Sequence, residues 1–350
     1  MSRTYPFHAQ PLWRRLLVSR ESAVIALLIL VLVWAINFVS YFATQLTMTY
    51  LFLDIAPILL IALPMTLIIV TGEIDLSVAS VVGLSSVMLG TLVDHGTSVP
   101  VAAVVALLAG LACGALNGFL VAYVGLPSLA VTIGTLALFR GIAVGVLGTK
   151  AVTDFPSRWT DLARQQIGGT GIPLIVAVFV VLAIVFTWLL HSSPFGRGVY
   201  DIGLNTEAAQ FTGVPVARTK FTLFLFSGVV SALAGIYFTL RFTSSRGDNA
   251  TGLELQVIAA VLLGGVSIFG GRGKVHGVIA GVLLIGVLSS ALRLQGVTVN
   301  VISIIVGLLL VASVMSTSVL AWVSDAAARR HNRGDRRPQL APTGVGNQER

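Results

Sequence analysis

The sequence has 350 residues, of which 56% are hydrophobic and only 10% are charged, and its mean hydropathy is +0.94. Soluble domains carry about 25% charged residues, so this composition excludes an ordinary soluble protein and favours a membrane protein. The net charge of +8 does not indicate nucleic acid, because the basic residues lie between long apolar runs and form no patch with aromatic residues. We therefore expect no nucleic-acid partner.

The N-terminal segment, residues 1–22, carries Arg3, Arg14, Arg15 and Arg20. The apolar run that follows, 23–42, is long enough to cross a bilayer. A cleaved signal peptide has a shorter apolar core and a small-x-small cleavage site, and neither is evident here. We predict a retained first transmembrane helix.

Ten apolar runs approach the roughly 20 residues that a helix needs to cross the hydrocarbon core. They lie at 23–42, 51–70, 76–93, 100–124, 129–149, 172–190, 221–240, 254–270, 275–292 and 298–323. The runs are continuous and not alternating, which favours helices over barrel strands. The predicted fold class is therefore all-α, a polytopic membrane protein with about ten transmembrane helices in a domain over 23–323.

The basic residues predict the orientation, because short cytoplasmic segments are enriched in lysine and arginine. With a cytoplasmic N-terminus and ten helices, the cytoplasmic segments hold 15 of the 22 basic residues. Both termini are then expected in the cytoplasm. The tail over 324–350 is rich in arginine and also carries Pro338 and Pro342, so we predict a disordered cytoplasmic tail.

No catalytic motif is recognisable in the sequence. The glycine-rich stretch GGRGKVHG from Gly270 lacks the spacing of a phosphate-binding loop, and Lys274 is not followed by Ser or Thr. The histidines show no metal-ligand spacing, and the only cysteine, Cys113, lies in an apolar run. We expect no enzyme, no metal and no cofactor, so any use of ATP requires a separate nucleotide-binding subunit.

The stretch TGEIDLSVAS from Thr71 places Glu73 and Asp75 between two closely spaced apolar runs. Two interpretations remain open. The stretch is either a tight turn with solvated carboxylates at the cytoplasmic face, or a broken helix whose opened backbone lies in a protein-lined cavity.

Arg140 lies midway along the run 129–149. A charge at this depth is costly and normally faces the bundle interior or an aqueous cavity; alternatively the helix is shorter and Arg140 reaches the interface. The uncharged polar residues Asn117, Gln256 and Asn300 also fall in apolar runs. Such residues either form hydrogen bonds between helices or line a substrate path.

A weak internal repeat relates the third and fourth runs to the eighth and ninth. IDLSVASVVGL from Ile74 is similar to LELQVIAAVLLGG from Leu253, with Asp75 facing Glu254, and AGLACGALN from Ala109 is similar to AGVLLIGVLSS from Ala280. An offset of five helices is odd, so the predicted repeat consists of two inverted five-helix halves. Glycines from Gly264 to Gly273 also predict a short, easily broken eighth helix.

The predicted cytoplasmic segment 191–220 contains a short amphipathic helix. Asn205 is a suitable N-cap, and Leu204, Ala208 and Phe211 recur at the spacing of one apolar helical face. This face either rests on the chain's own bundle or docks into a groove on a partner subunit.

Four motifs together resemble the permease subunits of bacterial ATP-binding-cassette (ABC) importers for ribose, xylose, rhamnose and related monosaccharides, and for autoinducer-2. They are TGEIDLSVAS at Thr71, TIGTLALFRG at Thr132, FGRGVYDIGLNTEAAQFTGV at Phe195 and GLELQVIAAVLLGGVSIFGGRGKVHG at Gly252. The resemblance covers about residues 50–315. The family often has glycine where this chain has Glu73 and Leu204.

The resemblance implies a permease that moves a simple sugar or autoinducer-2 across the inner membrane. Its expected partners are two cytoplasmic ABC ATPases, a second permease copy or paralogue, and a periplasmic or lipid-anchored solute-binding protein. The implied ATPase-coupling helix comprises Leu204, Asn205, Glu207, Ala208, Ala209, Phe211 and Gly213.

Candidate residues of the translocation path or gate are Glu73, Asp75, Asn117, Arg140, Glu254, Gln256 and Asn300. The alternative function is an ion-coupled secondary transporter that uses Glu73, Asp75 and Arg140 as a relay.

Overall fold

The computed structural model describes residues 20–312 and Met315. Within this part the chain is helical and has no β-strand, only isolated β-bridges such as the one between Val152 and Ser245. The prediction of an all-α polytopic membrane protein is confirmed. Most of the predicted N-terminal segment 1–22 and the whole tail 324–350 lie outside the described residues.

Each of the ten predicted apolar runs corresponds to one helix in the described part. The helices are α2 (Arg20–Phe38), α3 (Gln45–Val70), α4 (Val78–Asp94), α5 (Val99–Ala122), α6 (Ser128–Leu147), α8 (Leu174–Ser192), α11 (Val216–Phe242), α12 (Leu253–Leu263), α13 (Val275–Leu294) and a last helix over Val299–Ala312. Three further helices are short, namely α7 (Ser157–Arg164), α9 (Pro194–Leu204) and α10 (Thr206–Phe211).

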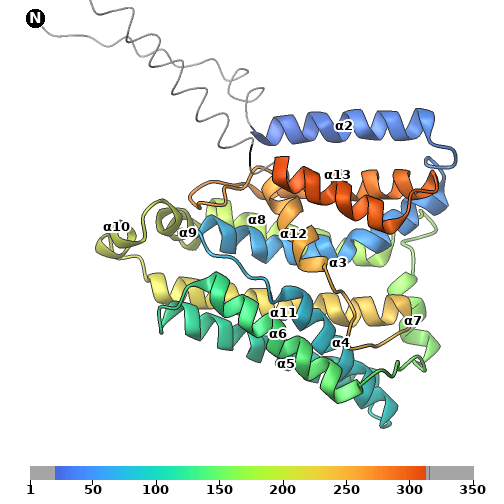
Figure 1. Cartoon of the computed structure of the whole chain (residues 1–350), viewed down its shortest axis with the longest axis horizontal. Helices are drawn as coiled ribbons and strands as arrows, with labels where there is room; N and C mark the ends of the chain where they lie inside the picture. The colour runs from blue at the N-terminus through green and yellow to red at the C-terminus, as the bar shows by residue number, and fades with distance from the viewer. Residues whose placement is uncertain (1–19, 313–314, 316–350) are drawn as a thin grey trace, which may run out of the picture.

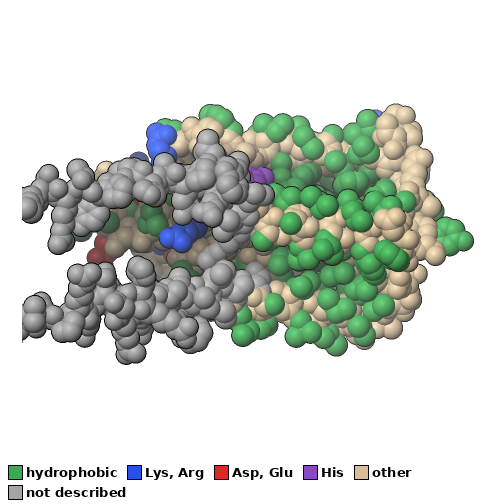
Figure 2. Space-filling model, turned by 90° about the horizontal axis from the view of Figure 1, so that it is seen from above, with side chains coloured by type: hydrophobic (Ala, Val, Ile, Leu, Met, Phe, Trp, Pro, Cys, Tyr) green, Lys and Arg blue, Asp and Glu red, His purple; other side chains and the backbone are tan. Residues whose placement is uncertain are grey.

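Seven of these helices have the length and hydropathy of membrane spans, whereas α4, α12 and the Val299–Ala312 helix are shorter apolar helices. Most of the long helices run along the longest dimension of the molecule, between an end that carries α9 and α10 and an end that carries α7 (Figure 1). On the face shown in Figure 2, hydrophobic side chains cover most of the described surface, and basic side chains gather mainly at the α9–α10 end. This distribution suits helices that are surrounded by lipid.

Helix α3 is the centre of the bundle. In its most apolar stretch 94% of the residues are buried, whereas the corresponding share in α2 is 11%. Helices α8, α11, α12 and α13 pack around α3. A helix that is apolar on all sides needs such a position or a lipid environment, and here protein supplies most of the contacts.

Helices α4 and α12 both begin inside the bundle (Figure 1). The link 71–77 leads from the end of α3 to α4, and the link 243–252 leads from the end of α11 to α12. Helix α4 runs toward the α7 end and α12 runs toward the α9–α10 end. Helix α4 is followed by the long helix α5, and α12 by the long helix α13, and each long helix runs in the opposite direction to the one before it. The pair α4–α5 is therefore inverted relative to the pair α12–α13, as the repeat predicts.

Helices α4 and α12, which have 17 and 11 residues, do not begin at equivalent positions of the repeat. In the register of the repeat, α4 begins three residues after Asp75, whereas α12 begins one residue before Glu254. The predicted eighth span 254–270 is also too long, because α12 ends at Leu263. Beyond it Gly265, Gly270 and Gly271 adopt positive φ angles of 93°, 81° and 70°, a conformation that ends a helix.

Helices α5 and α11 approach each other through glycine. A Cβ atom at Gly228 on α11 would lie 2.9 Å from Cα of Gly114 and would also meet the carbonyl oxygen of Gly110. Small residues allow this backbone contact, which is a usual way of packing transmembrane helices. The contact brings α5 and α11 together beside the link 71–77.

The substitution Gly228→Val is therefore expected to destabilise the protein by about 1–3 kcal/mol, because the added methyl groups overpack the α5–α11 contact. The midpoint of thermal unfolding in detergent measures the effect. Gly134→Val on α6 is the matched control, since a Cβ atom there meets nothing within 4 Å. Equal loss of stability in both variants would contradict the packing argument.

Candidate functional site

The link 71–77 is held inside the bundle by a hydrogen-bonded cluster around Asp75, which is only 2% exposed. One carboxylate oxygen accepts from the backbone N–H of Ser77 at 3.0 Å and from its hydroxyl at 2.6 Å. The other oxygen accepts from the hydroxyl of Ser227 on α11 at 2.7 Å. Asn117 on α5 donates to the hydroxyl of Ser77 at 2.8 Å. The solvated tight turn is therefore wrong for Asp75, and the enclosed link favours the broken-helix interpretation.

The opened backbone of this link is also satisfied by protein. The N–H of Ile74 donates to the hydroxyl of Ser128 at 3.1 Å, and the hydroxyl of Thr132 donates to the carbonyl of Ile74 at 3.3 Å. Both partners lie on α6. Because lipid offers no hydrogen bonds, non-helical backbone at this depth needs such partners.

Glu73 lies apart from the Asp75 cluster and forms an ion pair with Lys220 in the first turns of α11. Both side chains are largely buried, at 17% and 14% exposure. Lys220 lies nine residues after the end of α10 at Phe211. The pair therefore connects the link 71–77 to the end of the molecule that carries the predicted coupling helix.

Arg140 connects three separate elements. Its guanidinium donates to the carbonyl oxygens of Gly247 at 2.8 Å, Asn249 at 2.7 Å and Ala79 at 3.1 Å. Gly247 and Asn249 belong to the link 243–252, and Ala79 lies in the first turn of α4. Glu254 lies in the first turn of α12. Arg140 is thus bound to carbonyl oxygens of the protein.

Gln256, near the start of α12, lines a groove between α3, α12, α13 and the Val299–Ala312 helix. Its inner part has a volume of about 120 Å³, and a wider hollow of about 410 Å³ shares Leu51, Asp54, Ser290 and Arg293 with it. We call the two together the Asp54 groove. Its polar lining comprises Thr47, Tyr50, Asp54, Arg241, Gln256, Ser289, Ser290, Arg293 and Ser303. Asn300 is exposed and is not part of this lining.

Asp54 lies between two arginines of this groove. The guanidinium of Arg293 is 3.1 Å from one carboxylate oxygen, and that of Arg241 is 3.6 Å from the other. Sequence reasoning missed Asp54, Arg241 and Arg293 as site residues. A usable signal was present, because Asp54 is the one charged residue in the predicted span 51–70.

The predicted coupling segment forms two helices that meet at Asn205. The side-chain oxygen of Asn205 accepts from the backbone N–H of Ala208 at 2.9 Å, so Asn205 caps α10 as expected. The prediction placed Leu204 on this helix, which is wrong. Leu204 ends α9, because the backbone turns at Asn205. Gly213, with φ of 88°, follows the end of α10.

Helix α10 projects from the bundle (Figure 1). Glu207, Ala208 and Phe211 are exposed, Phe211 to 90%, whereas Ala209 is buried. A hollow of about 420 Å³ adjoins the helix and is lined by Ala122, Tyr123, Gln210, Val214, Pro215, Val216, Ala217 and Arg218. The rest of the described bundle therefore leaves the Phe211 side of α10 uncovered.

Tyr200 anchors α9 to the loop before α13. Its hydroxyl donates to the carbonyl of Gly273 at 2.6 Å. Burial raises the pKa of Tyr200 to about 12, so the hydroxyl remains a neutral donor at physiological pH. This hydrogen bond fixes the base from which α10 projects.

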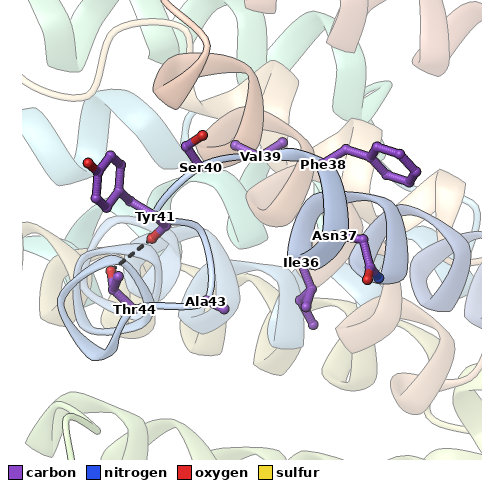
Figure 3. A pocket seen from close by; sticks show the side chains of 8 residues that line it. All are labelled: Ile36, Asn37, Phe38, Val39, Ser40, Tyr41, Ala43 and Thr44. Atoms are coloured by element: carbon purple, nitrogen blue, oxygen red, sulfur yellow. Dashed lines mark hydrogen bonds between the residues drawn. The ribbon is translucent and has the colours of Figure 1, made fainter.

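A further hollow of about 470 Å³ lies at the turn between α2 and α3 (Figure 3). The hydroxyl of Thr44 donates to the carbonyl of Tyr41 at 2.8 Å, and the amide of Asn37 donates to the carbonyl of Val33 at 2.8 Å. Phe38 and Tyr41 point away in different directions. Because these polar groups are engaged within the turn and its flanking helix, the hollow offers few groups to a solute.

The bundle of apolar helices, with two shorter helices that begin inside it, defines a multi-pass membrane protein of the transporter kind. Residues 47–314 match the family model described as the permease component of the branched-chain amino acid transport system. The chain belongs to this family. It is a permease subunit of an importer, located in the inner membrane, and is a transport component and not itself an enzyme.

Several relatives share the name autoinducer 2 import system permease protein LsrD. The protein from Yersinia enterocolitica is 36% identical over 266 residues, which cover 74% of this chain and 80% of the relative. The Salmonella typhimurium protein is 36% identical over 286 residues, or 78% of this chain and 84% of the relative. The Escherichia coli O9:H4 protein is 36% identical over 282 residues, or 78% and 85%. No solved structure matches the chain.

The substitution Asp75→Asn is expected to destabilise the protein by about 1–3 kcal/mol. An amide NH₂ group would replace one accepting oxygen, so a donor such as the Ser227 hydroxyl would lose its acceptor. Asp94→Asn, at the exposed end of α4, is the matched control and should have little effect. The midpoint of thermal unfolding in detergent measures both. An unchanged midpoint for Asp75→Asn would show that the cluster does not hold the link.

Proposed function

We propose that this chain forms the membrane path of an ABC importer for autoinducer-2 or a similar small, sugar-like solute. The observation that carries the proposal is the similarity to autoinducer 2 import permeases over 74–78% of the chain. The Asp54 groove supports it, because its mixture of carboxylate, guanidinium, amide and hydroxyl groups suits a solute rich in hydroxyls.

The complete importer contains further subunits in this proposal. Two cytoplasmic ATPases supply the energy, a second permease copy or paralogue completes the path, and a periplasmic or lipid-anchored solute-binding protein delivers the solute. The excess of basic residues in alternate segments supports a cytoplasmic location of both termini and of the α9–α10 end. The α7 end then faces outward and receives the binding protein.

Helix α10 is the proposed contact with the ATPase. Its exposed residues Glu207, Ala208 and Phe211, and the hollow beside Gln210, support this role. A displacement of α10 acts directly on α11, because only residues 212–215 separate the two helices. The ion pair between Lys220 and Glu73 then passes the displacement to the link 71–77.

The link 71–77 and α4 are the proposed moving parts of the gate. Asp75 and Asn117 keep the link attached to α5 and α11, and Arg140 keeps α4 attached to the link 243–252. Gln256 lies on the path itself, and Glu254 and Asn300 lie beside it. Binding of ATP favours one arrangement of these elements over the other, so the path opens to the two sides in turn.

The alternative, an ion-coupled secondary transporter, finds less support in the geometry. A relay needs acidic groups that exchange protons or ions with a path. Asp75 is enclosed by hydroxyl and backbone donors, Glu73 is paired with Lys220, and Arg140 is bound to carbonyl oxygens. These three residues are thus separate structural contacts and do not form a continuous chain.

Uptake of labelled autoinducer-2 by cells of the native host tests the proposal. Deletion of this chain should abolish uptake, and its return on a plasmid should restore it. Depletion of ATP should stop uptake, whereas a protonophore should not when ATP is maintained. Uptake that persists without ATP and stops with the protonophore would favour the ion-coupled alternative.

The substitution Phe211→Ala is expected to weaken the association with the ATPase, since exposed aromatic side chains often supply much of the affinity of an interface. The amount of ATPase that co-purifies in mild detergent should fall about tenfold if the substitution removes ~1.4 kcal/mol of binding free energy. Phe38→Ala is the matched control, because Phe38 is also exposed but lies at the opposite end. Equal recovery of the ATPase with both variants would contradict the assignment of α10.

A further inference from the structure

Helix α3 contains two prolines away from its ends, Pro57 and Pro64. A proline has no backbone N–H, and its ring collides with the carbonyl group four residues earlier, so it interrupts the helical hydrogen bonds and is a common site of bending. The carbonyl of Leu53 therefore loses its helical donor at Pro57. Leu53 is only 3% exposed, and a buried carbonyl without a partner is unfavourable.

Tyr237 on α11 supplies the missing hydrogen bond. Its hydroxyl donates to the carbonyl of Leu53 at 2.9 Å, and Tyr237 itself is only 6% exposed. At this position α3 is thus held by a neighbouring helix instead of by its own backbone. A bend at Pro57 breaks no bond within α3 there, so the hydroxyl of Tyr237 controls how the two parts of the helix are oriented.

The two parts of α3 differ in burial, and the change falls beside the missing bond. All residues over 55–70 are buried, whereas the residues over 45–54 are buried only in part, namely at Thr49, Leu51 and Leu53. Ile55 is closely packed against α13, because a Cβ atom at Gly286 would lie 2.5 Å from its side chain. We call residues 45–54 the first segment of α3. The rest of the helix is enclosed by protein, whereas the first segment has room to move.

The charged contacts of the first segment tolerate a small displacement. The guanidinium of Arg241 is 3.6 Å from Asp54, which exceeds hydrogen-bond length. It also lies 5.5 Å from the ring centre of Tyr50. Arg293 is 3.1 Å from Asp54, but its side chain is long and 57% exposed, so it can follow the carboxylate. The short, buried hydrogen bond from Tyr237 is the more demanding contact.

The start of the first segment is attached to a loop. The amide of Gln45 donates to the carbonyl of Gly169 at 3.0 Å, and the hydroxyl of Thr49 donates to that of Gly171 at 2.6 Å. The loop 165–173 joins α7 to α8, and both glycines have positive φ angles, 72° and 80°. A loop without regular helical bonds can follow the segment when it moves.

We propose that the missing bond at Pro57 makes a hinge in α3, and that Tyr237 is the positioning residue that keeps the hinge closed. With its hydrogen bond formed, the first segment stays against α11. Without this bond the segment tilts, and the Asp54 groove changes width, because the segment lines it through Thr47, Tyr50 and Asp54. This inference rests on the proposed function, which it deepens by identifying a moving part of the path at the α7 end.

Electron paramagnetic resonance measures the position of the first segment in the full chain, reconstituted in lipid nanodiscs. Cys113→Ala removes the single native cysteine. Spin labels on Leu46→Cys and Val101→Cys, both at exposed positions, then report the distance between the first segment and α5. Tyr237→Phe removes only the hydroxyl and should widen the distance distribution and add longer distances. An unchanged distribution would overturn the hinge.

A second substitution distinguishes the hinge from a general loss of packing. Pro57→Ala restores a backbone N–H within α3, so the carbonyl of Leu53 no longer needs Tyr237. Pro57→Ala combined with Tyr237→Phe should therefore return the narrow distribution. Pro64→Ala combined with Tyr237→Phe is the matched control and should stay broad, because Leu53 still lacks a helical donor. Two broad or two narrow distributions would overturn the assignment of the hinge to Pro57.

Uptake of labelled autoinducer-2 tests whether the hinge serves the path. Pro57→Ala alone should lower the rate of uptake, because the restored bond stiffens α3. A rate equal to that of the unchanged protein would overturn the role of the hinge in transport.

The distance measurement needs no solute, so the outcomes separate this inference from the proposed function. A chain that imports autoinducer-2 but shows no effect of Tyr237→Phe would overturn the hinge and leave the proposed function standing. The expected distances in a chain that imports no autoinducer-2 would support the hinge and overturn the proposed solute.

Discussion

The fold depends on how the polar link 71–77 is satisfied inside an apolar bundle. The two oxygens of Asp75 accept from Ser77 and Ser227, and Asn117 completes the cluster. Without these donors, a carboxylate and an opened backbone would be buried without hydrogen-bond partners, at a cost of several kcal/mol per group. This requirement determines where α4 begins, and therefore how α5 and α11 pack against it.

The second link, 243–252, is held by Arg140, which donates to two of its carbonyl oxygens and to the carbonyl of Ala79. The two inverted links thus use opposite chemistry, a carboxylate that accepts in one and a guanidinium that donates in the other. Arg140 also contacts α4, so it joins the start of α4 to the link that leads into α12. A displacement of one half can reach the other through this residue.

These contacts divide the polar residues of the membrane domain into two groups. Asp75, Asn117 and Arg140 are engaged with protein and hold the links in place. Asp54, Gln256 and Arg293 line a groove and remain accessible to a solute. The ion pair of Glu73 and Lys220 belongs to neither group and connects the first link to the region of α10.

The sequence by itself determined the fold class, the ten apolar helices and the family, because hydropathy and the four motifs are local properties of the chain. It also marked the stretch around Asp75 and the glycines after α12 as candidate breaks. Tertiary structure alone decided the partners of the polar residues. Asp54 and Arg293 are 239 residues apart, and Asp75 and Ser227 are 152 apart. No local pattern encodes such pairs, because they arise only when helices pack, and the same packing decides which polar groups are buried and which face the groove.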